Sequence, residues 1–400
     1  MPNESLIYEN QGVAGPGIHA LIVGVSEYAF LPENDDLPRD ESWNFTRLTS
    51  AAISAYRIYR WLEEHKDDLR LKVKSIRLLL ASSAAEKAAE PALQTLATPV
   101  PTWQAFKDAA WEWRTAASNN LEDITFFYFA GHGLQRSPEE GILVLADFAE
   151  PQTSKLSRCV SFGEVRNGMA LTDEIPLIAQ TQFYFVDACR VRPSDALNKL
   201  VNPRPAEIWD VLLPTNEKRA APVLFSTVDN AIALGRDGQT TYFAEGLLLA
   251  LDNAAEDPDD SNDGPPVWPV TSTTLKTALD NFYARHKVGT RVTPGGWQGA
   301  PILRYLPGPP DVDVEIFLRP DLLTGDGKIV LCDDDWVPLH EIAPCPTIPI
   351  QRRIKAGIYR LSFESPRITA SPYKSKSKAL SQRAAVWPHD LSSRFRPGDS

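Results

Sequence analysis

Two short hydrophobic runs of the chain each lead to a reactive side chain. Residues 126–133 (FFYFAGHG) carry His132 near their end, and residues 182–189 (QFYFVDAC) end in Cys189. Both runs are rich in aromatic residues and bounded by small or polar ones, which predicts buried central strands rather than helices. Because the carboxyl ends of strands line the ligand crevice of open α/β sheets, the pattern predicts one site in which a base and a thiol meet.

The remaining hydrophobic segments alternate between strand-like and helix-like patterns. Strands are predicted at 18–25, 74–80, 222–227 and 298–305, and an added hairpin at 141–146. Apolar residues recur at three- and four-residue spacing, as in helices, at 48–62, 102–117, 171–179, 243–251 and 275–286. The Ala-rich segment 82–96 fits either a short helix or a loop. This alternation predicts a mostly parallel sheet with helices on both faces.

The patterning divides the chain into a polar lead (1–16), the alternating domain (17–307), a β-rich module (311–366) and a basic tail (367–400). Within the alternating domain, the Pro-rich stretch 191–221 is predicted to be an exposed loop. The β-rich module is predicted because apolar residues such as Val312 and Val314 are separated by charged or polar ones. The tail is rich in Ser, Lys, Arg and Pro, a composition typical of poorly ordered segments.

Composition narrows the classes of function. The chain has 400 residues, 43% of them hydrophobic, enough for one large core and a second small one. Its formal net charge of −11 argues against a nucleic-acid groove, because phosphate binding relies on clustered Lys and Arg. No segment approaches the roughly 18 to 20 apolar residues of a membrane-spanning helix, so we expect a cytoplasmic protein without a membrane partner. The four cysteines are widely spaced and form no CxxC pair, so neither a zinc site nor a disulfide framework is expected.

Several segments, taken in order, resemble the caspase-like peptidase domain of bacterial caspase homologues over about residues 17–307. They are HALIVGVSEY, LTSAAISA, FYFAGHG, FYFVDAC, VLFSTVDN, TTYFAEGLLLAL and QGAP. The resemblance implies a caspase-like three-layer α/β sandwich with a mostly parallel, six-stranded sheet. It also implies peptide-bond hydrolysis by a dyad of His132 and Cys189, with a protein as substrate and no cofactor.

Such a dyad needs few groups. The Cys189 thiolate would attack the scissile carbonyl, and His132 would support the thiolate and then protonate the leaving amine. The resulting oxyanion needs preorganised N–H donors, each contributing about 3 to 4 kcal/mol in comparable sites. Gly133 and the Cys189 amide are the predicted donors, because glycine lets the backbone turn sharply and approach the substrate.

Substrate specificity is where the chain departs from the family. In relatives that cut after basic residues, the helix matching LTSAAISA carries an Asp where this chain has Ser54, and a second acid precedes the nucleophile by two residues. Only the second acid is present here, as Asp187. A single carboxylate can still select Arg or Lys at P1, the residue whose carbonyl is attacked, so we favour basic P1 specificity over acidic or small apolar P1. Asp36 and Asp229 are candidates for the pocket rim, and Arg190 follows the nucleophile as in relatives that cut after Asp.

Two loops carry further expectations. The segment 259–264 (DDSNDG) begins like a calcium-binding loop, but its twelfth position would be Val270 where a bidentate Glu is required, so we favour a solvated turn over a metal site. In caspase relatives the connection equivalent to 191–221 is a processing site. Its residues Arg204, Lys218 and Arg219 make autocleavage there a hypothesis.

Two classes of function follow. The first is an active cysteine endopeptidase that cuts a partner protein, with the β-rich module and the tail choosing that partner or localising the enzyme. The second is a catalytically silent caspase-like scaffold that binds a peptide or a sensor protein. The pairing of His132 with Cys189 favours the first. The family resemblance also implies a bacterial role in stress or antiviral defence.

Overall fold

The computed structural model describes residues 4–32, 43, 45–137, 140–190, 204–215, 218–228, 235–255, 267–296, 299–316, 328–332, 337–342, 350–364 and 378–380. Contacts divide the chain into two compact units. The first comprises Met1–Leu249 and Tyr283–Arg304, and the second comprises Ala250–Phe282 and Tyr305–Ser400. Each unit is described by itself.

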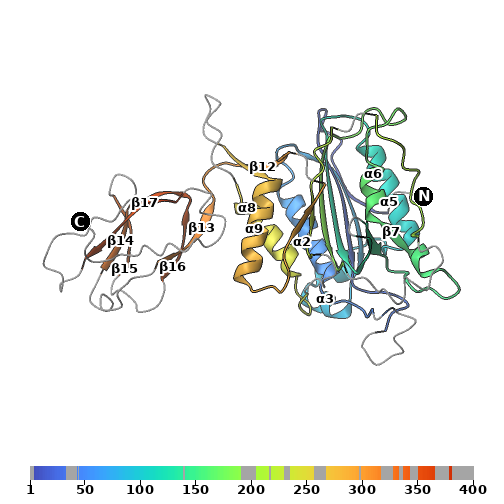
Figure 1. Cartoon of the computed structure of the whole chain (residues 1–400), viewed down its shortest axis with the longest axis horizontal. Helices are drawn as coiled ribbons and strands as arrows, with labels where there is room; N and C mark the ends of the chain where they lie inside the picture. The colour runs from blue at the N-terminus through green and yellow to red at the C-terminus, as the bar shows by residue number, and fades with distance from the viewer. Residues whose placement is uncertain are drawn as a thin grey trace. The chain divides into compact units, whose positions relative to one another are not determined.

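A seven-stranded sheet forms the centre of the first unit (Figure 1). Its strands, in spatial order, are β1 (Leu6–Glu9), β3 (Val73–Ala81), β2 (Ile18–Val25), β4 (Ile124–Gly131), β8 (Thr181–Ala188), β9 (Val223–Phe225) and β11 (Thr293–Gly295). The five inner strands run parallel, whereas β1 and β11 pair antiparallel at the two edges. The predicted mostly parallel α/β sheet is therefore confirmed.

The predicted strand count was wrong at both edges of this sheet. The lead contributes β1, although its polar composition gave no strand signal. At the other edge β9 pairs with the short segment Thr293–Gly295, in which Pro294 is tolerated because an edge strand leaves one side unpaired. The strand predicted at 298–305 exists as β12 (Ile302–Leu306) but pairs with β10 (Trp268–Thr271) in a separate sheet. Hydrophobic alternation predicts a strand without specifying its partner.

Helices cover both faces of the sheet, giving three layers. In Figure 1, α2 (Ala51–Glu64) lies on one face and α5 (Trp103–Ala116) on the other. Successive residues of a strand point to opposite faces, so Leu21 and Val23 of β2 pack in one cluster with Trp113 of α5. Predicted helices at 48–62, 102–117, 243–251 and 275–286 are confirmed as α2, α5, α8 (Tyr242–Asn253) and α9 (Ser272–Arg285), and 82–96 contains α3 (Ala84–Ala89) and α4 (Ala92–Thr95).

Gly24 sets the distance between β2 and α2. A Cβ atom at this position would lie 2.6 Å from Ala55 Cβ and 2.8 Å from Ala52 Cα. We therefore expect Gly24→Ala to lower the free energy of unfolding by about 1 to 3 kcal/mol through overpacking, measured by urea denaturation. Gly15→Ala is the matched control, because no atom lies within 4 Å of its added Cβ. Equal stability of the two variants would contradict the expectation.

The helix predicted at 171–179 is not formed. Thr172 and Ile175 instead exchange two backbone hydrogen bonds of 3.1 and 3.2 Å, which closes a turn. Pro176 follows and offers no N–H group to a helix. The helix in this part of the chain is α6 (Phe162–Asn167), which follows the confirmed hairpin of β5 (Gly133–Ser137) and β6 (Glu140–Val144) and the adjoining strand β7 (Cys159–Ser161).

The stretch 191–221 is only partly the exposed loop that its proline content predicts. Among its described residues, Ile208 and Trp209 are buried, and both of their amide N–H groups donate to Glu164 Oε1, at 2.6 and 3.2 Å. Gly168 makes room for the indole, since a Cβ there would overlap it. Arg219 is also buried and donates to the Arg166 carbonyl oxygen at 2.8 Å.

The second unit contains the predicted β-rich module. Strand β13 (Asp311–Ile316) pairs antiparallel with β16 (Ile350–Lys355), and a four-stranded sheet has the order β15 (Pro338–Ile342), β14 (Lys328–Cys332), β17 (Gly357–Glu364) and β18 (Lys378–Leu380). Apart from β18, the tail 367–400 lies outside the described residues. Across the described chain, no helix combines the length and apolar composition needed to cross a bilayer.

Candidate functional site

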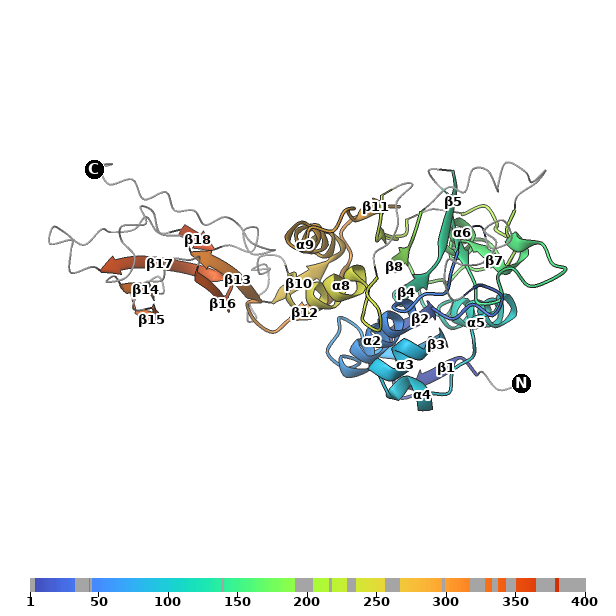
Figure 2. The same cartoon turned by 90° about the horizontal axis from the view of Figure 1, so that it is seen from below.

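The strand register brings His132 and Cys189 together. Strands β4 and β8 are parallel neighbours, visible side by side in Figure 2, and their last paired residues are Gly131 and Ala188. His132 and Cys189 directly follow the last residues of the two strands. Since neighbouring strands lie about 4.8 Å apart, the base and the thiol occupy facing positions at the carboxyl edge of the sheet. Cys189 is partly exposed there and forms no disulfide.

His132 is buried and held by three aromatic or backbone contacts. Its ring stacks on Phe45 with centroids 4.4 Å apart, its Nε2 lies 2.6 Å from the Thr46 carbonyl oxygen, and its backbone N–H donates to the Tyr28 hydroxyl at 2.8 Å. The Thr46 contact assigns the ring proton to Nε2, which leaves Nδ1 as the basic nitrogen. Burial lowers the pKa of His132 to about 4, partly opposed by the bond to Thr46, so the imidazole is neutral at pH 7.

Gly133 packs directly against the nucleophile's backbone. A Cβ atom on Gly133 would lie 2.3 Å from the Cys189 carbonyl oxygen and 2.9 Å from Ala188 Cβ. Only glycine allows the two backbones to approach this closely. Both predicted oxyanion donors, the amides of Gly133 and Cys189, therefore belong to adjoining backbone segments.

Asp187 on β8 and Ser54 on α2, two of the predicted pocket residues, lie in one buried polar cluster. Asp187 Oδ2 accepts hydrogen bonds from the Tyr128 hydroxyl, at 3.1 Å, and from the Thr241 hydroxyl. The Ser54 hydroxyl oxygen accepts the Thr241 backbone N–H at 2.9 Å. We call these four residues the Asp187 cluster. Burial raises the pKa of Asp187 to about 6, although hydrogen bonds from hydroxyl groups lower it.

Thr241 and Tyr128 were missed at the level of sequence. Thr241 directly precedes the apolar run of α8, so a helix cap was its only recognisable signal, and its Oγ1 does accept the Ala244 N–H at 3.1 Å. Its second bond, to Asp187, joins residues 54 positions apart and has no local pattern. Tyr128 points into the cluster from the middle of β4, where an aromatic residue is expected simply as core.

The structure does not describe all of the other residues predicted to bear on specificity. Asp36 and Asp229 lie outside the described residues, as does the Asp-rich loop 259–264, whose predicted twelfth position, Val270, is buried in β10. The guanidinium of Arg190 lies over the Phe225 ring, 4.5 Å from its centroid, a cation–π contact.

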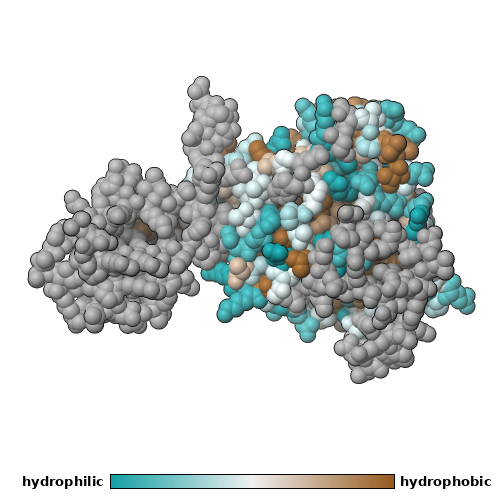
Figure 3. Space-filling model, viewed as in Figure 1, coloured by the Kyte–Doolittle hydropathy of each residue, from teal (hydrophilic) through white to brown (hydrophobic). Residues whose placement is uncertain are grey.

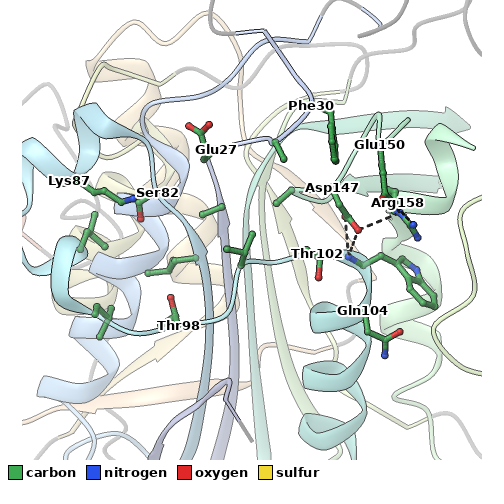
Figure 4. Close-up of a pocket in the computed structure, with 18 of the residues that line it drawn as sticks. Glu27, Phe30, Ser82, Lys87, Thr98, Thr102, Gln104, Asp147, Glu150 and Arg158 are labelled. Carbon is green, nitrogen blue, oxygen red and sulfur yellow. Dashed lines mark hydrogen bonds and ion pairs between the residues drawn. The ribbon is translucent and has the colours of Figure 1, made fainter. Parts of the chain in front are cut away.

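A cavity of about 890 Å³ opens beside the site, at the carboxyl ends of β2 and β3 (Figure 4). Glu27 and Ala29 line it and flank Tyr28, whose hydroxyl holds the His132 backbone. On the other side, Asp147 pairs with Arg158 and accepts the first N–H of α5. No residue of the Asp187 cluster lines this cavity. The surface of the first unit shown in Figure 3 mixes hydrophilic residues with scattered hydrophobic ones, as is ordinary for a water-exposed surface.

The raised pKa of Asp187 makes a pH dependence of stability testable. Its folded-state pKa of about 6 lies above its ordinary value of 3.8, so the folded state binds more protons between these values. The free energy of unfolding contributed by Asp187 therefore falls as pH rises through this window, by at most about 3 kcal/mol. We expect Asp187→Asn to be more stable than wild type at pH 7 and the two to converge near pH 4.

The comparison between variant and wild type isolates this effect from His132. Burial depresses the pKa of His132, so its contribution to stability is present at pH 7 and is lost as pH falls from 6.5 through about 4. The pH dependence from His132 is opposite in sign to that from Asp187. It is the same in wild type and Asp187→Asn, so it cancels when their free energies of unfolding are subtracted. Urea denaturation at several pH values measures this difference. A pH-independent difference would contradict the expectation.

The mostly parallel sheet, covered by helices on both faces, has the architecture predicted for a caspase-like α/β domain. A sequence model of the caspase domain matches residues 18–263, more than half of the chain. The chain therefore belongs to the caspase domain family, which confirms the resemblance. The domain is that of a class of cysteine peptidases, whose substrates are proteins.

The chain is similar at low identity to one protein sequence and two solved structures. Over 304 residues the chain is 24% identical to the uncharacterised protein y4kE of Sinorhizobium fredii, covering 72% of this chain and 82% of that protein. Protein GSU0716 of Geobacter sulfurreducens matches with a TM-score of 0.40 at 14% identity, covering 70% of this chain and 93% of its own. Caspase-1 of Spodoptera frugiperda matches with a TM-score of 0.41 at 11% identity, covering 70% and 87%.

Proposed function

We propose that the protein is a cysteine endopeptidase that hydrolyses peptide bonds of a partner protein through His132 and Cys189, with a preference for Arg or Lys at P1. The register of β4 and β8 carries the proposal. It pairs the carboxyl ends of these two central strands, which His132 and Cys189 directly follow. Gly133 supports it further, since its backbone lies against the Cys189 carbonyl oxygen.

The chemistry divides into two steps. The Cys189 thiol gives its proton to His132 Nδ1 as sulfur bonds to the scissile carbonyl carbon, and the oxyanion is held by the Gly133 and Cys189 amides. The C–N bond then breaks while His132 returns the proton to the leaving amine, leaving a thioester on Cys189. A water molecule, deprotonated by the same nitrogen, hydrolyses the thioester and regenerates the thiol. A neutral imidazole is required at the start, and burial of His132 keeps it neutral.

The Asp187 carboxylate supports basic P1 specificity. Its described neighbours are hydroxyl groups, which donate hydrogen bonds without compensating its charge. The guanidinium of Arg190, the nearest cation in sequence, lies over the Phe225 ring. A buried carboxylate is stabilised most by a cation, and the side chain of a substrate Arg or Lys would supply one.

We also propose autoprocessing in the stretch 191–221. The expected cut lies before Ile208. Ala220 bridges to Thr181 at the start of β8, the opposite end of that strand from Cys189, so the adjoining Lys218 and Arg219 lie away from the nucleophile. Prolonged incubation of active protein should yield a fragment whose N-terminus precedes residue 208. An intact band, or a cut after Lys218 or Arg219, would contradict this.

A peptide-library cleavage profile tests the proposed function. We expect the wild type to cleave peptides with Arg or Lys at P1 and Cys189→Ala to cleave none. Cleavage only after acidic or apolar residues would overturn the P1 assignment while leaving the peptidase activity in place. No cleavage by the wild type would overturn the peptidase and favour the peptide-binding scaffold. We further propose that the β-rich module selects the partner, in a bacterial stress or antiviral response of the kind the family implies.

A further inference from the structure

The two oxygens of Asp187 have different surroundings. Oδ2 accepts two hydroxyl hydrogen bonds, from Tyr128 and from Thr241. Oδ1 is buried and has no hydrogen-bond partner among the residues the structure describes. The Ser226 hydroxyl also lowers the pKa of Asp187 through a side-chain hydrogen bond, but within ordinary hydrogen-bond distance it donates to the Ala188 carbonyl oxygen, at 3.4 Å. Two hydroxyl groups thus occupy Oδ2 from inside the protein, whereas Oδ1 keeps the greater capacity to accept a further donor.

The direction of the Thr241 hydroxyl is set by its neighbours. Its Oγ1 already accepts the Ala244 N–H at 3.1 Å, so its hydrogen is the group turned to Asp187. The Thr241 backbone is held in turn by the 2.9 Å bond from its N–H to the Ser54 oxygen, and Ser54 donates its own hydrogen to the Ser50 carbonyl at 2.6 Å. Ser54 stands where relatives that cut after basic residues carry their first acid. It therefore positions Thr241 against Asp187, which corresponds to their second acid.

A carboxylate with one available oxygen does not suit lysine and arginine equally. Arginine gains most from a bidentate contact, in which its planar fork donates one hydrogen bond to each carboxylate oxygen. Lysine is a compact charge that needs one oxygen. Occupation of Oδ2 removes the bidentate contact and leaves the lysine contact intact.

We propose that Thr241 is a specificity-determining residue, whose hydroxyl occupies Asp187 Oδ2 and thereby makes lysine, rather than arginine, the preferred P1 residue. The inference rests on the proposed function, because it assumes that Asp187 receives the P1 side chain.

The test compares kcat/KM for two peptides that differ only in Lys or Arg at P1. The wild type should prefer Lys. Thr241→Val, which is nearly isosteric but lacks the hydroxyl, should shift the Lys-to-Arg ratio toward Arg by about tenfold, the effect of one charge-assisted hydrogen bond. Thr241→Ser retains the hydroxyl and should retain the wild-type ratio. Enzyme concentration is set by titration with a thiol-reactive peptide probe, so that misfolded protein does not enter the comparison.

Tyr128→Phe provides a second test should Thr241→Val fail to fold for want of its helix cap. It removes the other donor to Oδ2 and should move the ratio in the same direction. A wild-type preference for Arg, or a ratio that neither Thr241→Val nor Tyr128→Phe changes, would overturn the inference and leave the peptidase standing. Failure of the wild type to cleave any library peptide would instead overturn the proposed function itself.

Discussion

Replacement of Cys189 by Ala is expected to abolish labelling by a peptide-based thiol-reactive probe and to lower kcat/KM for peptide hydrolysis by about 10⁴-fold or more. Alanine cannot form the thioester, and the remaining backbone donors can stabilise only an uncatalysed attack by water. His132→Ala should lower both labelling and hydrolysis, because it removes the imidazole that is proposed to accept the thiol proton.

Cys159→Ala is the matched control for the labelling experiment. Cys159 is fully buried in β7, and burial raises the pKa of its thiol well above the usual range, so it should not react with the probe. Its replacement should leave labelling at the wild-type level. Wild-type protein that reacts no better than Cys189→Ala would show that Cys189 is not an activated nucleophile and would end the peptidase interpretation.

Gly133→Ala is expected to lower kcat by about 10² to 10³-fold, the loss found when one oxyanion donor is displaced, with a smaller change in KM. The added methyl group would lie 2.3 Å from the Cys189 carbonyl oxygen, and the contact is relieved only if one of the two backbone segments moves. Either movement displaces an amide that faces the oxyanion. Steady-state kinetics with a lysine peptide measure the effect.

Gly141→Ala provides the control for this variant. Gly141 lies in β6, in the hairpin that follows Gly133, and the nearest atoms to its added Cβ are 3.9 Å away. It should therefore retain wild-type kcat. If Gly133→Ala also retained it, the Gly133 amide would not be an oxyanion donor.

Much of the fold follows from local patterns, and the failures have physical causes. The runs around His132 and Cys189 are buried on both faces and form central strands as predicted, because aromatic, uninterrupted hydrophobic segments suit no other position. The edge strands β1 and β11 carry little hydrophobic signal, since an edge can be short and polar. The segment 171–179 has helical spacing of its apolar residues, but Thr172 and Pro176 favour a closed turn.

The candidate site divides in the same way. The positions of His132 and Cys189 follow from two strand ends, and the parallel register pairs the residues directly before them, Gly131 and Ala188. The contacts around Asp187 could not be predicted, because Thr241 reaches it from a distant loop through a side-chain hydroxyl. Hydrophobic periodicity carries no information on such bonds. The family resemblance implies an acid at the position of Ser54, whereas in this chain the Ser54 hydroxyl accepts the Thr241 backbone N–H.

The pairing of β4 with β8 also limits where residues can be inserted into or deleted from this chain. The pairing runs without a bulge from Ile124 opposite Thr181 to Gly131 opposite Ala188. Adding or deleting one residue within either strand would shift its last side chain along the sheet by about 3.3 Å and turn it to the other face. Changes in length can therefore accumulate between the strands, in the connection from Gly133 to Thr181, but not inside them. Evolutionary drift in this protein should appear as loops of unequal length around strands of constant length.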